Sequence, residues 1–363
     1  MVGVALLMVG CVWADLDDNE TLDGIIAEAI DGNTLQERGK DGEKLAYAPN
    51  QETPYTGWAK EMYDNGQIEM LAQIKDGKQD GLLIWWYENG QKKAEITWKD
   101  GKQDGLTMAW YENGDKEFET NHKDGEQDGL GSYWYENGQK KREENRKDGK
   151  LDGLLTEWYE NGQKKLVGSL KDGKKHGLAT LWYANGQMLR EGAWVDGKPD
   201  GLGSYWHENG QKKTVVNWKA GKQDGLGKTW HENGQKKAEI TWKDGKQDGL
   251  TTAWYENGDK KWEGNFKGGT PMTGVSWKPN GEKCPVTNVK DGNGVSVWYY
   301  ENGKKRVEGN YKNGKTVTTV AWKPNGDKCP VTNVVNGNGV WVWYNDDGTE
   351  SFRTTYKDGV KVD

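Results

Sequence analysis

The chain has 363 residues, of which 33% are hydrophobic, and it contains 52 glycines. A compact domain of this length normally carries about 45–50% apolar residues, so the composition excludes one thick core. The 21 Trp and 16 Tyr residues exclude a disordered chain, which would be poor in aromatic residues. The formal net charge of -7 argues against nucleic acid as a partner, because phosphate binding needs a basic surface.

The chain begins with an apolar run, residues 2–10, that ends at Cys11. The run is too short to span a bilayer and has the size of a signal-peptide core. Residues 8–11 resemble a bacterial lipobox, so we predict that residues 1–14 direct export and that Cys11 is lipidated. Cleavage after Ala14 and a buried N-terminal strand are the alternatives. The expected location is the bacterial cell envelope, as a lipoprotein or a periplasmic protein, with the cytoplasm as the alternative. Contact with the membrane is expected only through this lipid anchor.

Residues 15–48 differ from the rest of the chain and are expected to form an N-terminal helical cap. Apolar residues recur at helical spacing within residues 21–30, which predicts a short amphipathic helix. Such a helix would cover the first edge of a sheet, because open edges promote aggregation and terminal repeats are usually atypical.

From residue 49 to residue 274 the chain repeats a unit of 24 residues, each marked by an Asn-Gly dipeptide. A fixed period in this range predicts one small structural unit stacked many times. Asn-Gly after an aromatic run is also the strongest short-range signal of a hairpin. In the unit 81–104 we predict strands over 82–87 and 92–99, joined by the loop of Glu88, Asn89 and Gly90. A longer connection, residues 100–105, would lead to the next unit.

The apolar pattern selects a register for this hairpin. With the three-residue loop, one face is apolar, and the other carries Leu83, Trp85 and Tyr87 together with Lys93, Glu95 and Thr97, which separates apolar from polar residues better than a two-residue loop does. We therefore predict that all tryptophan rows lie along one common face and that a tyrosine row lies on the opposite face. For the exceptional unit with Arg142, Glu144 and Arg146 we expect a local bend or a solvent gap. The predicted apolar face of the unit 81–104 consists of Leu82, Ile84, Trp86, Ala94, Ile96 and Trp98.

Residues 275–363 contain two divergent units of 45 residues, each with a Cys-Pro dipeptide. Cys284 and Cys329 hold the same place in the two copies, which four strands would separate by roughly 19 Å. Because a disulfide needs Cα atoms within about 7 Å, we expect both thiols to be free. Proline favours edges and bulges, so these units are expected to end or bend the sheet.

These features together predict the fold class. We expect an all-β chain, an elongated, twisted, single-layer antiparallel β-meander of tandem 24-residue hairpin repeats, with a short N-terminal helix. The predicted parts are the segments 1–14, 15–48, 49–274 and 275–363.

The motif GxxxxWYENGQKKxExxWKDGKxDG, found in about a dozen copies, resembles the MORN-variant repeat, and residues 55–58 have the opening typical of MORN repeats. The resemblance covers residues 50–363 and implies a fold of short hairpins. Bacterial chains of this type are similar to those grouped as the YwqK-type toxin–antitoxin antitoxin family. That resemblance implies binding and neutralising a toxin protein, whereas MORN-type arrays generally serve protein contact, lipid contact or spacing.

No constellation of residues predicts catalysis, and we expect neither a cofactor nor a metal. His207 and His231 would stand roughly 10 Å apart, two strands away from each other, whereas joint zinc ligation needs both within about 2 Å of one ion. The Asp-Gly loops offer two carboxylates in a six-residue turn, whereas calcium takes six to eight oxygens. The sequence therefore predicts that the Asp-Gly pairs of these loops serve to form tight turns. It also predicts that the chain is not an enzyme.

The predicted function is that of a non-enzymatic repeat scaffold for protein–protein or cell-envelope binding through the faces of its sheet, with an unknown protein partner. One alternative is an antitoxin-like inhibitor that sequesters a toxin. Another is binding of a glycan or a lipid head group through aromatic rows. The candidate binding surface is the row of Tyr87, Tyr111, Tyr135, Tyr159, Tyr183, His207, His231 and Tyr255.

Overall fold

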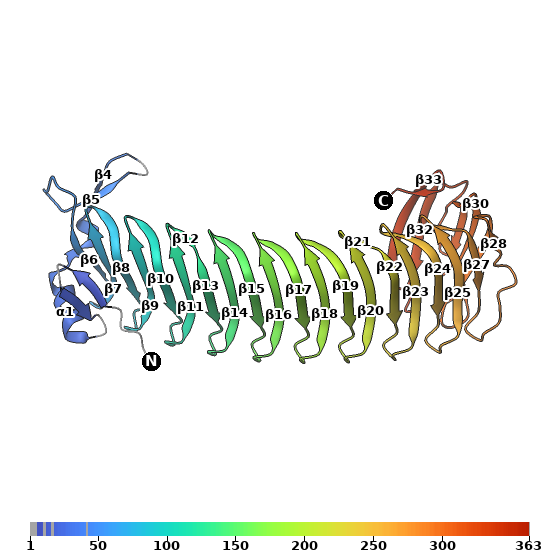
Figure 1. Ribbon diagram of the computed structural model, residues 1–363, viewed down its shortest axis with the longest axis horizontal. Coiled ribbons are helices and arrows are strands. Elements are labelled where there is room, and N and C mark those ends of the chain that lie inside the picture. The colour runs from blue at the N-terminus through green and yellow to red at the C-terminus, as the bar shows by residue number, and fades with distance from the viewer. Residues whose placement is uncertain (1–5, 10–11, 16–17, 41–42, 363) are drawn as a thin grey trace. The chain divides into compact units, whose positions relative to one another are not determined.

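The computed structural model describes residues 6–9, 12–15, 18–40 and 43–362 of the chain (Figure 1). They belong to two compact units, Met1–Lys175 and His176–Asp363. Each unit is an antiparallel meander of hairpins, and the described residues include one α-helix, near the N-terminus. The predicted all-β meander of hairpin repeats with a short N-terminal helix is therefore confirmed. None of the described helices has the length and apolar character needed to cross a membrane.

The N-terminal helix α1 (Asn19–Glu28) lies close to the predicted range. Its N-cap is Asp18, whose carboxylate accepts hydrogen bonds from the backbone N–H of Thr21 at 2.9 Å and from the Thr21 hydroxyl at 2.6 Å. These two bonds lower the pKa of Asp18 and satisfy a donor of the first turn. Strands β1 (Leu6–Val9) and β2 (Val12–Asp15) pair antiparallel before it. The predicted lipidation residue Cys11 lies outside the described residues.

Helix α1 covers one face of the first hairpins. Its side chains Leu22, Ile25, Ile26 and Ala29 pack in a cluster with Leu71, Leu82, Ile84 and Trp86 of the sheet. The following strand β3 (Ile30–Asp31) pairs in parallel with the first hairpin strand β6, so the segment also covers the sheet edge. The first edge is therefore paired by β3, whereas the helix, which we expected at the edge, covers a face of the sheet.

From β6 to β16 consecutive strands pair in the meander, except that β12 and β13 both pair with β11. The remaining elements of the first unit follow in chain order. They are η1 (Gly32–Thr34), β4 (Gln36–Arg38), β5 (Leu45–Tyr47), β6 (Gly57–Met62), β7 (Ile68–Lys75), β8 (Lys78–Trp86), β9 (Lys92–Lys99), β10 (Lys102–Trp110), β11 (Lys116–Lys123), β12 (Glu126–Gln127), β13 (Gly129–Trp134), β14 (Lys140–Lys147), β15 (Lys150–Trp158) and β16 (Lys164–Lys171).

The second unit continues the same pattern and ends in two three-stranded sheets, β29–β31 and β32–β34. Its strands are β17 (Lys174–Trp182), β18 (Met188–Val195), β19 (Lys198–Trp206), β20 (Lys212–Lys219), β21 (Lys222–Gln223), β22 (Gly225–Trp230), β23 (Lys236–Lys243), β24 (Lys246–Trp254), β25 (Lys260–Lys267), β26 (Thr270–Pro271), β27 (Thr273–Ser276), β28 (Val289–Lys290), β29 (Gly294–Tyr299), β30 (Lys305–Lys312), β31 (Lys315–Ala321), β32 (Gly339–Tyr344), β33 (Glu350–Lys357) and β34 (Val360–Lys361).

Two kinds of turn alternate along the meander. Between β8 and β9, Tyr87 and Gln91 enclose the predicted three-residue loop, and Gly90 adopts the left-handed φ of 83° that this loop requires. Between β9 and β10 the chain turns at Asp100 and Gly101 alone, with φ of 48° and 79°. The longer connection that we predicted over 100–105 is therefore wrong, because Lys102 already pairs with Lys99.

The predicted register is also wrong, although the loop is right. One extra residue, Lys93, is inserted after Lys92, so that Trp86 faces Lys92 while Trp85 faces Ala94. This β-bulge turns the rest of β9 over by one residue and exchanges its two faces. The same shift recurs in the other 24-residue units of both parts of the chain.

As a consequence, the tryptophans are divided between the two faces, and the predicted common face is not found. Leu82, Ile84 and Trp86 share one face with the polar side chains of Glu95 and Thr97, which are their partners or neighbours in β9. We call this side, with its equivalents in each hairpin, the leucine face. The other side, the cavity face, carries Leu83, Trp85, Ala94, Ile96 and Trp98 in the same hairpin.

The ionic unit of β14 is well packed and contains neither a bend nor a gap. Glu144 is only 1% exposed, and its carboxylate forms ion pairs with Arg142 and with Arg146, the latter at 2.7 Å. The Tyr133 hydroxyl donates to the same carboxylate at 3.4 Å, and β14 pairs with both of its neighbours. The expected bend or solvent gap is therefore wrong, because the three charges satisfy one another within the sheet.

Candidate functional site

The tyrosine row joins each repeat to the next one. The hydroxyl of Tyr111 donates a hydrogen bond to the backbone carbonyl of Trp134 at 2.8 Å, 23 residues further along the chain. Tyr183 does the same with Trp206 at 3.0 Å in the second unit. Burial raises the pKa of Tyr111, so its hydroxyl stays a donor. The same bond is formed by Tyr63, Tyr87, Tyr135 and Tyr255.

Two histidines take the place of tyrosine in this ladder. The Nε2 atom of His207 lies 3.3 Å from the carbonyl oxygen of Trp230, and that of His231 lies 3.2 Å from the oxygen of Trp254. An imidazole that carries its proton on Nε2 can therefore donate the bond that the phenol donates elsewhere. This contact gives a physical reason for histidine at these two positions without any metal.

Some side chains of the candidate binding surface are thus buried or covered by other residues of the chain. Tyr255 is fully buried and His231 is 8% exposed, so neither offers a free ring to a partner. Lysine amines lie over other rings of the row, as Lys93 does over Tyr87 at 5.5 Å and Lys141 over Tyr135 at 5.5 Å. Tyr159 holds the equivalent position after β15. Binding through the faces of the remaining rings stays a prediction.

Asparagine and aspartate build two further ladders. The side-chain amide of Asn113 donates to the carbonyl of Glu136 at 3.1 Å, while its oxygen accepts from the N–H of Asp115. The carboxylate of Asp104 accepts the backbone N–H of Asp124, 20 residues further along, at 3.1 Å. The aspartates that were considered for calcium are therefore engaged in joining repeats. Equivalent carboxylate bonds are formed by Asp80, Asp128, Asp152, Asp200, Asp224 and Asp248.

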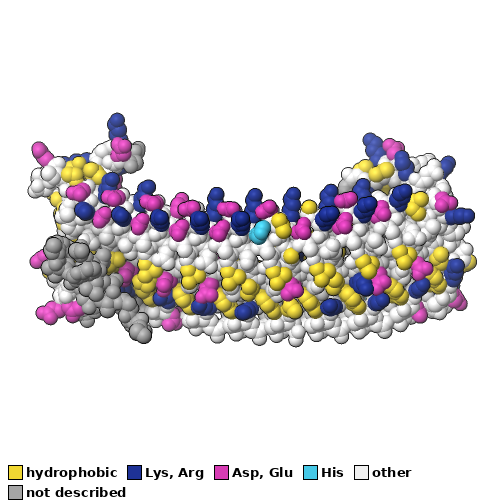
Figure 2. Space-filling view, viewed as in Figure 1, with side chains coloured by type: hydrophobic (Ala, Val, Ile, Leu, Met, Phe, Trp, Pro, Cys, Tyr) yellow, Lys and Arg dark blue, Asp and Glu magenta, His cyan; other side chains and the backbone are white. Residues whose placement is uncertain are grey.

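The leucine face exposes a row of large apolar side chains. Leu202 is 58% exposed in the second unit, whereas Leu82 at the same place in the first unit is 4% exposed. The tryptophans of this face are better protected, since Lys236 lies over the ring of Trp254 at 5.5 Å while pairing with Glu239 at 2.9 Å. Figure 2 shows hydrophobic side chains at the surface of the hairpins beside rows of alternating charges. The exposed leucines are Leu130 and Leu154 in the first unit and Leu178, Leu202, Leu226 and Leu250 in the second.

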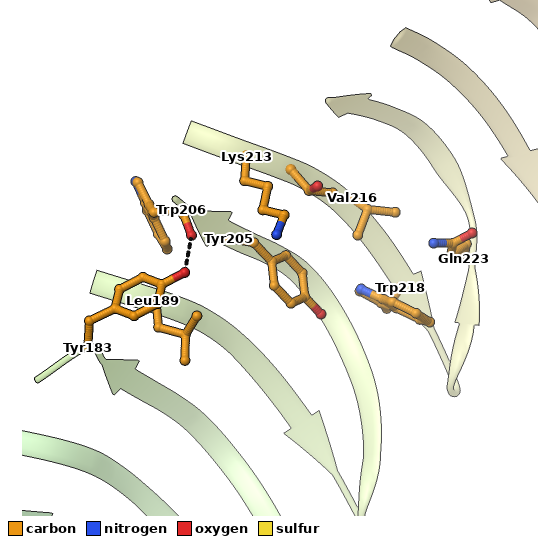
Figure 3. Close-up of a pocket in the computed structure, with 9 residues that line it drawn as sticks. Tyr183, Leu189, Tyr205, Trp206, Lys213, Val216, Trp218 and Gln223 are labelled. Atoms are coloured by element: carbon orange, nitrogen blue, oxygen red, sulfur yellow. Dashed lines mark hydrogen bonds between the residues drawn. The ribbon is translucent and has the colours of Figure 1, made fainter. Parts of the chain in front are cut away.

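Hollows open on the cavity face of the second unit, and two of them are described by their lining residues. The smaller hollow, of about 230 Å³, lies over β18–β20, and Figure 3 shows Tyr205, Val216 and Trp218 around it. The bond from Tyr183 to Trp206 closes one end of it. The larger cavity, of about 920 Å³, lies between β23–β25 and the two C-terminal sheets. Both hollows are lined by aromatic rings together with hydroxyl, amide and lysine side chains.

The two Cys-Pro units hold free thiols, as expected. Cys284 is buried, which opposes its ionisation. Hydrogen bonds from the Thr287 and Tyr299 hydroxyls and from the backbone N–H groups of Val286 and Thr287 outweigh this effect and lower the pKa of Cys284 to about 7. Cys329 has the equivalent partners Thr332 and Tyr344, and its pKa is lowered as well. The thiols are too buried to serve as exposed nucleophiles.

Sequence reasoning missed the large cavity and the exposure of the leucines. The cavity gathers residues from Ala238 to Lys361, so no local motif in the sequence indicates it. Tryptophan gives no signal either, because Trp262, Trp298, Trp341 and Trp343 lie in a segment that is no richer in tryptophan than the 24-residue repeats.

Comparisons with known proteins identify the repeat. A family model described as a MORN repeat variant matches residues 79–100, 127–148, 151–172, 223–244 and 293–313. A second model, described as a MORN repeat, matches residues 167–188 and 191–212. MORN-type repeats are therefore present in both units. A comparison with curated protein sequences found no match.

Among solved structures, the chain is similar to the crystal structure of TcdB2-TccC3-TEV, at 11% identity and a TM-score of 0.17, covering 91% of this chain and 20% of that chain. It is also similar to the Photorhabdus luminescens Tc holotoxin pore with the mutation TccC3-D651A, at 10% identity and a TM-score of 0.16, with coverage of 91% and 20%. The chain thus spans about a fifth of the length of these proteins. TM-scores of this size are too low to show a shared fold.

Proposed function

We propose that this chain of MORN-type repeats is a non-enzymatic scaffold that binds a protein partner through its leucine face. The observation that carries the proposal is the row of leucines that stay about half exposed on consecutive hairpins of the second unit. Contiguous exposed apolar side chains are rare on monomeric soluble proteins and usually mark an interaction site.

The chain itself indicates what kind of segment fits this face. In the first unit, the equivalent positions Leu82, Ile84 and Trp86 are buried by the apolar side of α1. Neighbouring leucines of the row are two strands apart, which corresponds to about 9.6 Å. Seven residues of helix rise by about 10.5 Å, so a helix lying along the row can meet successive leucines with residues at positions i and i+7. The partner is therefore proposed to present an amphipathic helix.

Site-specific photocrosslinking tests this proposal. Benzoylphenylalanine is placed at Leu202 or Leu226, which are exposed, and at Lys219, the exposed last residue of β20, as a control outside the leucine row. We expect both leucine positions, but not Lys219, to capture the same protein in the host cell. The captured segment should have apolar residues at helical spacing, and the flanking change Leu250→Asp should reduce capture by roughly tenfold, about 1.4 kcal/mol. Absence of adducts at 202 and 226, or adducts that map to strands, would contradict the proposal.

Neutralisation of a toxin would be one special case of this protein binding, and it is motivated by the family resemblance alone. It requires that the captured partner be toxic when produced without this chain and harmless when both are produced together. Growth of cells that express the partner alone and with the chain decides this case.

We further infer that the chain is exported and lipidated at Cys11, from the apolar run of residues 2–10 and the lipobox-like residues 8–11. Metabolic labelling with a fatty acid should mark the chain and should fail with Cys11→Ala. An unlabelled chain found only in the cytosol would remove this part of the proposal.

A further inference from the structure

The large cavity of the second unit is walled by strands from three sheets. Its floor is the cavity face of β23–β25, and the opposite walls come from β29–β31 and β32–β34. Its volume of about 920 Å³ is near the upper end of the range for ligand sites, about 300–1,000 Å³. It is large enough for a ligand of several rings.

Aromatic rings line this cavity in a continuous cluster. The rings of Trp262 and Trp298 are stacked, with centroids 4.7 Å apart and an angle of 19° between their planes. Trp343 meets Trp298 edge-on at 6.2 Å, and Trp341 meets Trp343 at 5.6 Å. Flat apolar surfaces of this kind are suited to stacking with the C–H faces of sugar rings or with aromatic rings.

Several buried polar atoms of the wall have no hydrogen-bond partner. They are the indole N–H groups of Trp262 and Trp341 and the hydroxyls of Thr251 and Ser296. Trp262, Thr251 and Ser296 are 1%, 6% and 2% exposed. An unsatisfied buried donor costs about 1–3 kcal/mol, so four of them in one cavity point to a ligand that offers oxygen acceptors. A pure hydrocarbon would leave all four without partners.

The charged side chains that line the cavity are all positive. Lys246, Lys315 and Lys361 are among them, and none of the described residues that line the cavity is an aspartate or a glutamate. The chain as a whole has a net charge of -7, so this local excess of positive charge runs against the average. It favours a ligand that carries anionic groups.

From these three features we propose that the cavity binds an acidic oligosaccharide, a short sugar chain that carries carboxylates. Its ring faces stack on the tryptophans, its hydroxyl and ring oxygens accept from the buried N–H and O–H donors, and its carboxylates lie near the three lysines. The site lies on the cavity face, so this proposal stands or falls independently of a partner on the leucine face.

Titration calorimetry of the full chain tests the proposal with trigalacturonate, which has one carboxylate per ring. The fully methyl-esterified trisaccharide serves as a neutral control of the same shape. We expect the acid to bind at least tenfold more tightly than the ester at low salt, and the difference to shrink as salt is added. Equal affinity of the acid and the ester, or no heat with either at millimolar concentration, would overturn the proposal.

Two substitutions locate the binding. Lys246→Glu is paired with Lys222→Glu, which changes the same position of the preceding repeat and does not line the cavity. We expect Lys246→Glu to weaken binding about tenfold and Lys222→Glu to leave it unchanged. Trp341→Phe keeps an aromatic ring but removes one N–H donor, and should weaken binding about fivefold with an unchanged far-ultraviolet spectrum. Equal effects of the two lysine changes, or tighter binding of adenosine monophosphate than of the trisaccharide, would rule out this site or this ligand class.

Discussion

The leucine face has two different environments within one chain. Beneath α1 in the first unit, Leu82 is buried in a small core, whereas Leu202 in the second unit stands at the equivalent place of its hairpin and faces solvent. Turns, bulges and ladders are the same in both regions. The difference shows that a repeat keeps its fold through hydrogen bonds to the neighbouring repeats, without a helix packed on its leucine face. Where a helix is present, as at α1, a local hydrophobic core is added.

Truncating the two leucines should give the largest contrast. Leu82→Ala removes a buried side chain and leaves a cavity under α1, which should lower the free energy of unfolding by about 3 kcal/mol. Leu202→Ala should cost less than about 1 kcal/mol, because little apolar contact is lost. Urea unfolding, with hydrogen exchange of the affected hairpin, measures both. Similar costs would mean that the exposed leucine is covered in solution.

Substitution of Glu144 measures the stability that a buried side chain on the cavity face contributes, away from the core under α1. Glu144→Ala leaves Arg142 and Arg146 without their carboxylate and should cost about 2 kcal/mol, less than a fully buried pair because both arginines are partly exposed. The neighbouring Glu143→Ala breaks only a surface pair with Lys140 and should cost less than about 0.5 kcal/mol. Thermal unfolding of the two variants gives the comparison, and equal melting temperatures would contradict it.

The tyrosine ladder should have the same strength in both regions. Tyr111→Phe and Tyr183→Phe each remove one hydrogen bond to a tryptophan carbonyl, and each should cost about 1 kcal/mol. Hydrogen exchange of the hairpins on either side of the change is the direct measurement. A cost confined to the first unit would show that the ladder depends on the core under α1.

The pH dependence of the Cys284 thiol gives a further measurement, within the second unit. Its pKa is lowered from 9.0 in the ordinary state to about 7 in the fold. Between these values the unfolded chain binds more protons than the folded chain, so stability should rise from pH 7 to pH 9 and this gain should be lost as the pH falls through 7. Denaturation at pH 6.5 and pH 9 should show the rise, and Cys284→Ala should reduce it. An undiminished rise in the variant would assign the effect to other groups.

Much of the fold followed from the sequence. The period, the strand over residues 92–99, the three-residue loop and the short helix were all readable, because each depends on local spacing or turn chemistry. The bulge at Lys93 was not readable. The apolar pattern favoured the register without a bulge, which gathers more apolar side chains on one face, whereas the hairpin carries apolar residues on both faces.

The functional surfaces were less predictable for two reasons. Tyr111, Asn113 and Asp104 bind backbone groups of the next repeat, and a backbone partner has no residue identity that a sequence could reveal. Leu202 is exposed because no described helix packs on it, and the sequence of its own repeat does not show whether a helix is present. The sequence marked the tyrosine row as a candidate binding surface, but it did not predict that the row joins the repeats.

The hydrogen bonds of these ladders join residues at a constant separation along the chain, so the array can lose or gain whole repeats. If residues 112–135 were deleted, the Tyr111 hydroxyl would meet the carbonyl of Trp158 in place of Trp134, and Asp104 would receive the N–H of Asp148 in place of Asp124. Every junction would close again with the same chemistry. In-frame recombination between copies could therefore lengthen or shorten the row of exposed leucines, and with it the extent of the partner helix that can be held, without any new side chain having to evolve.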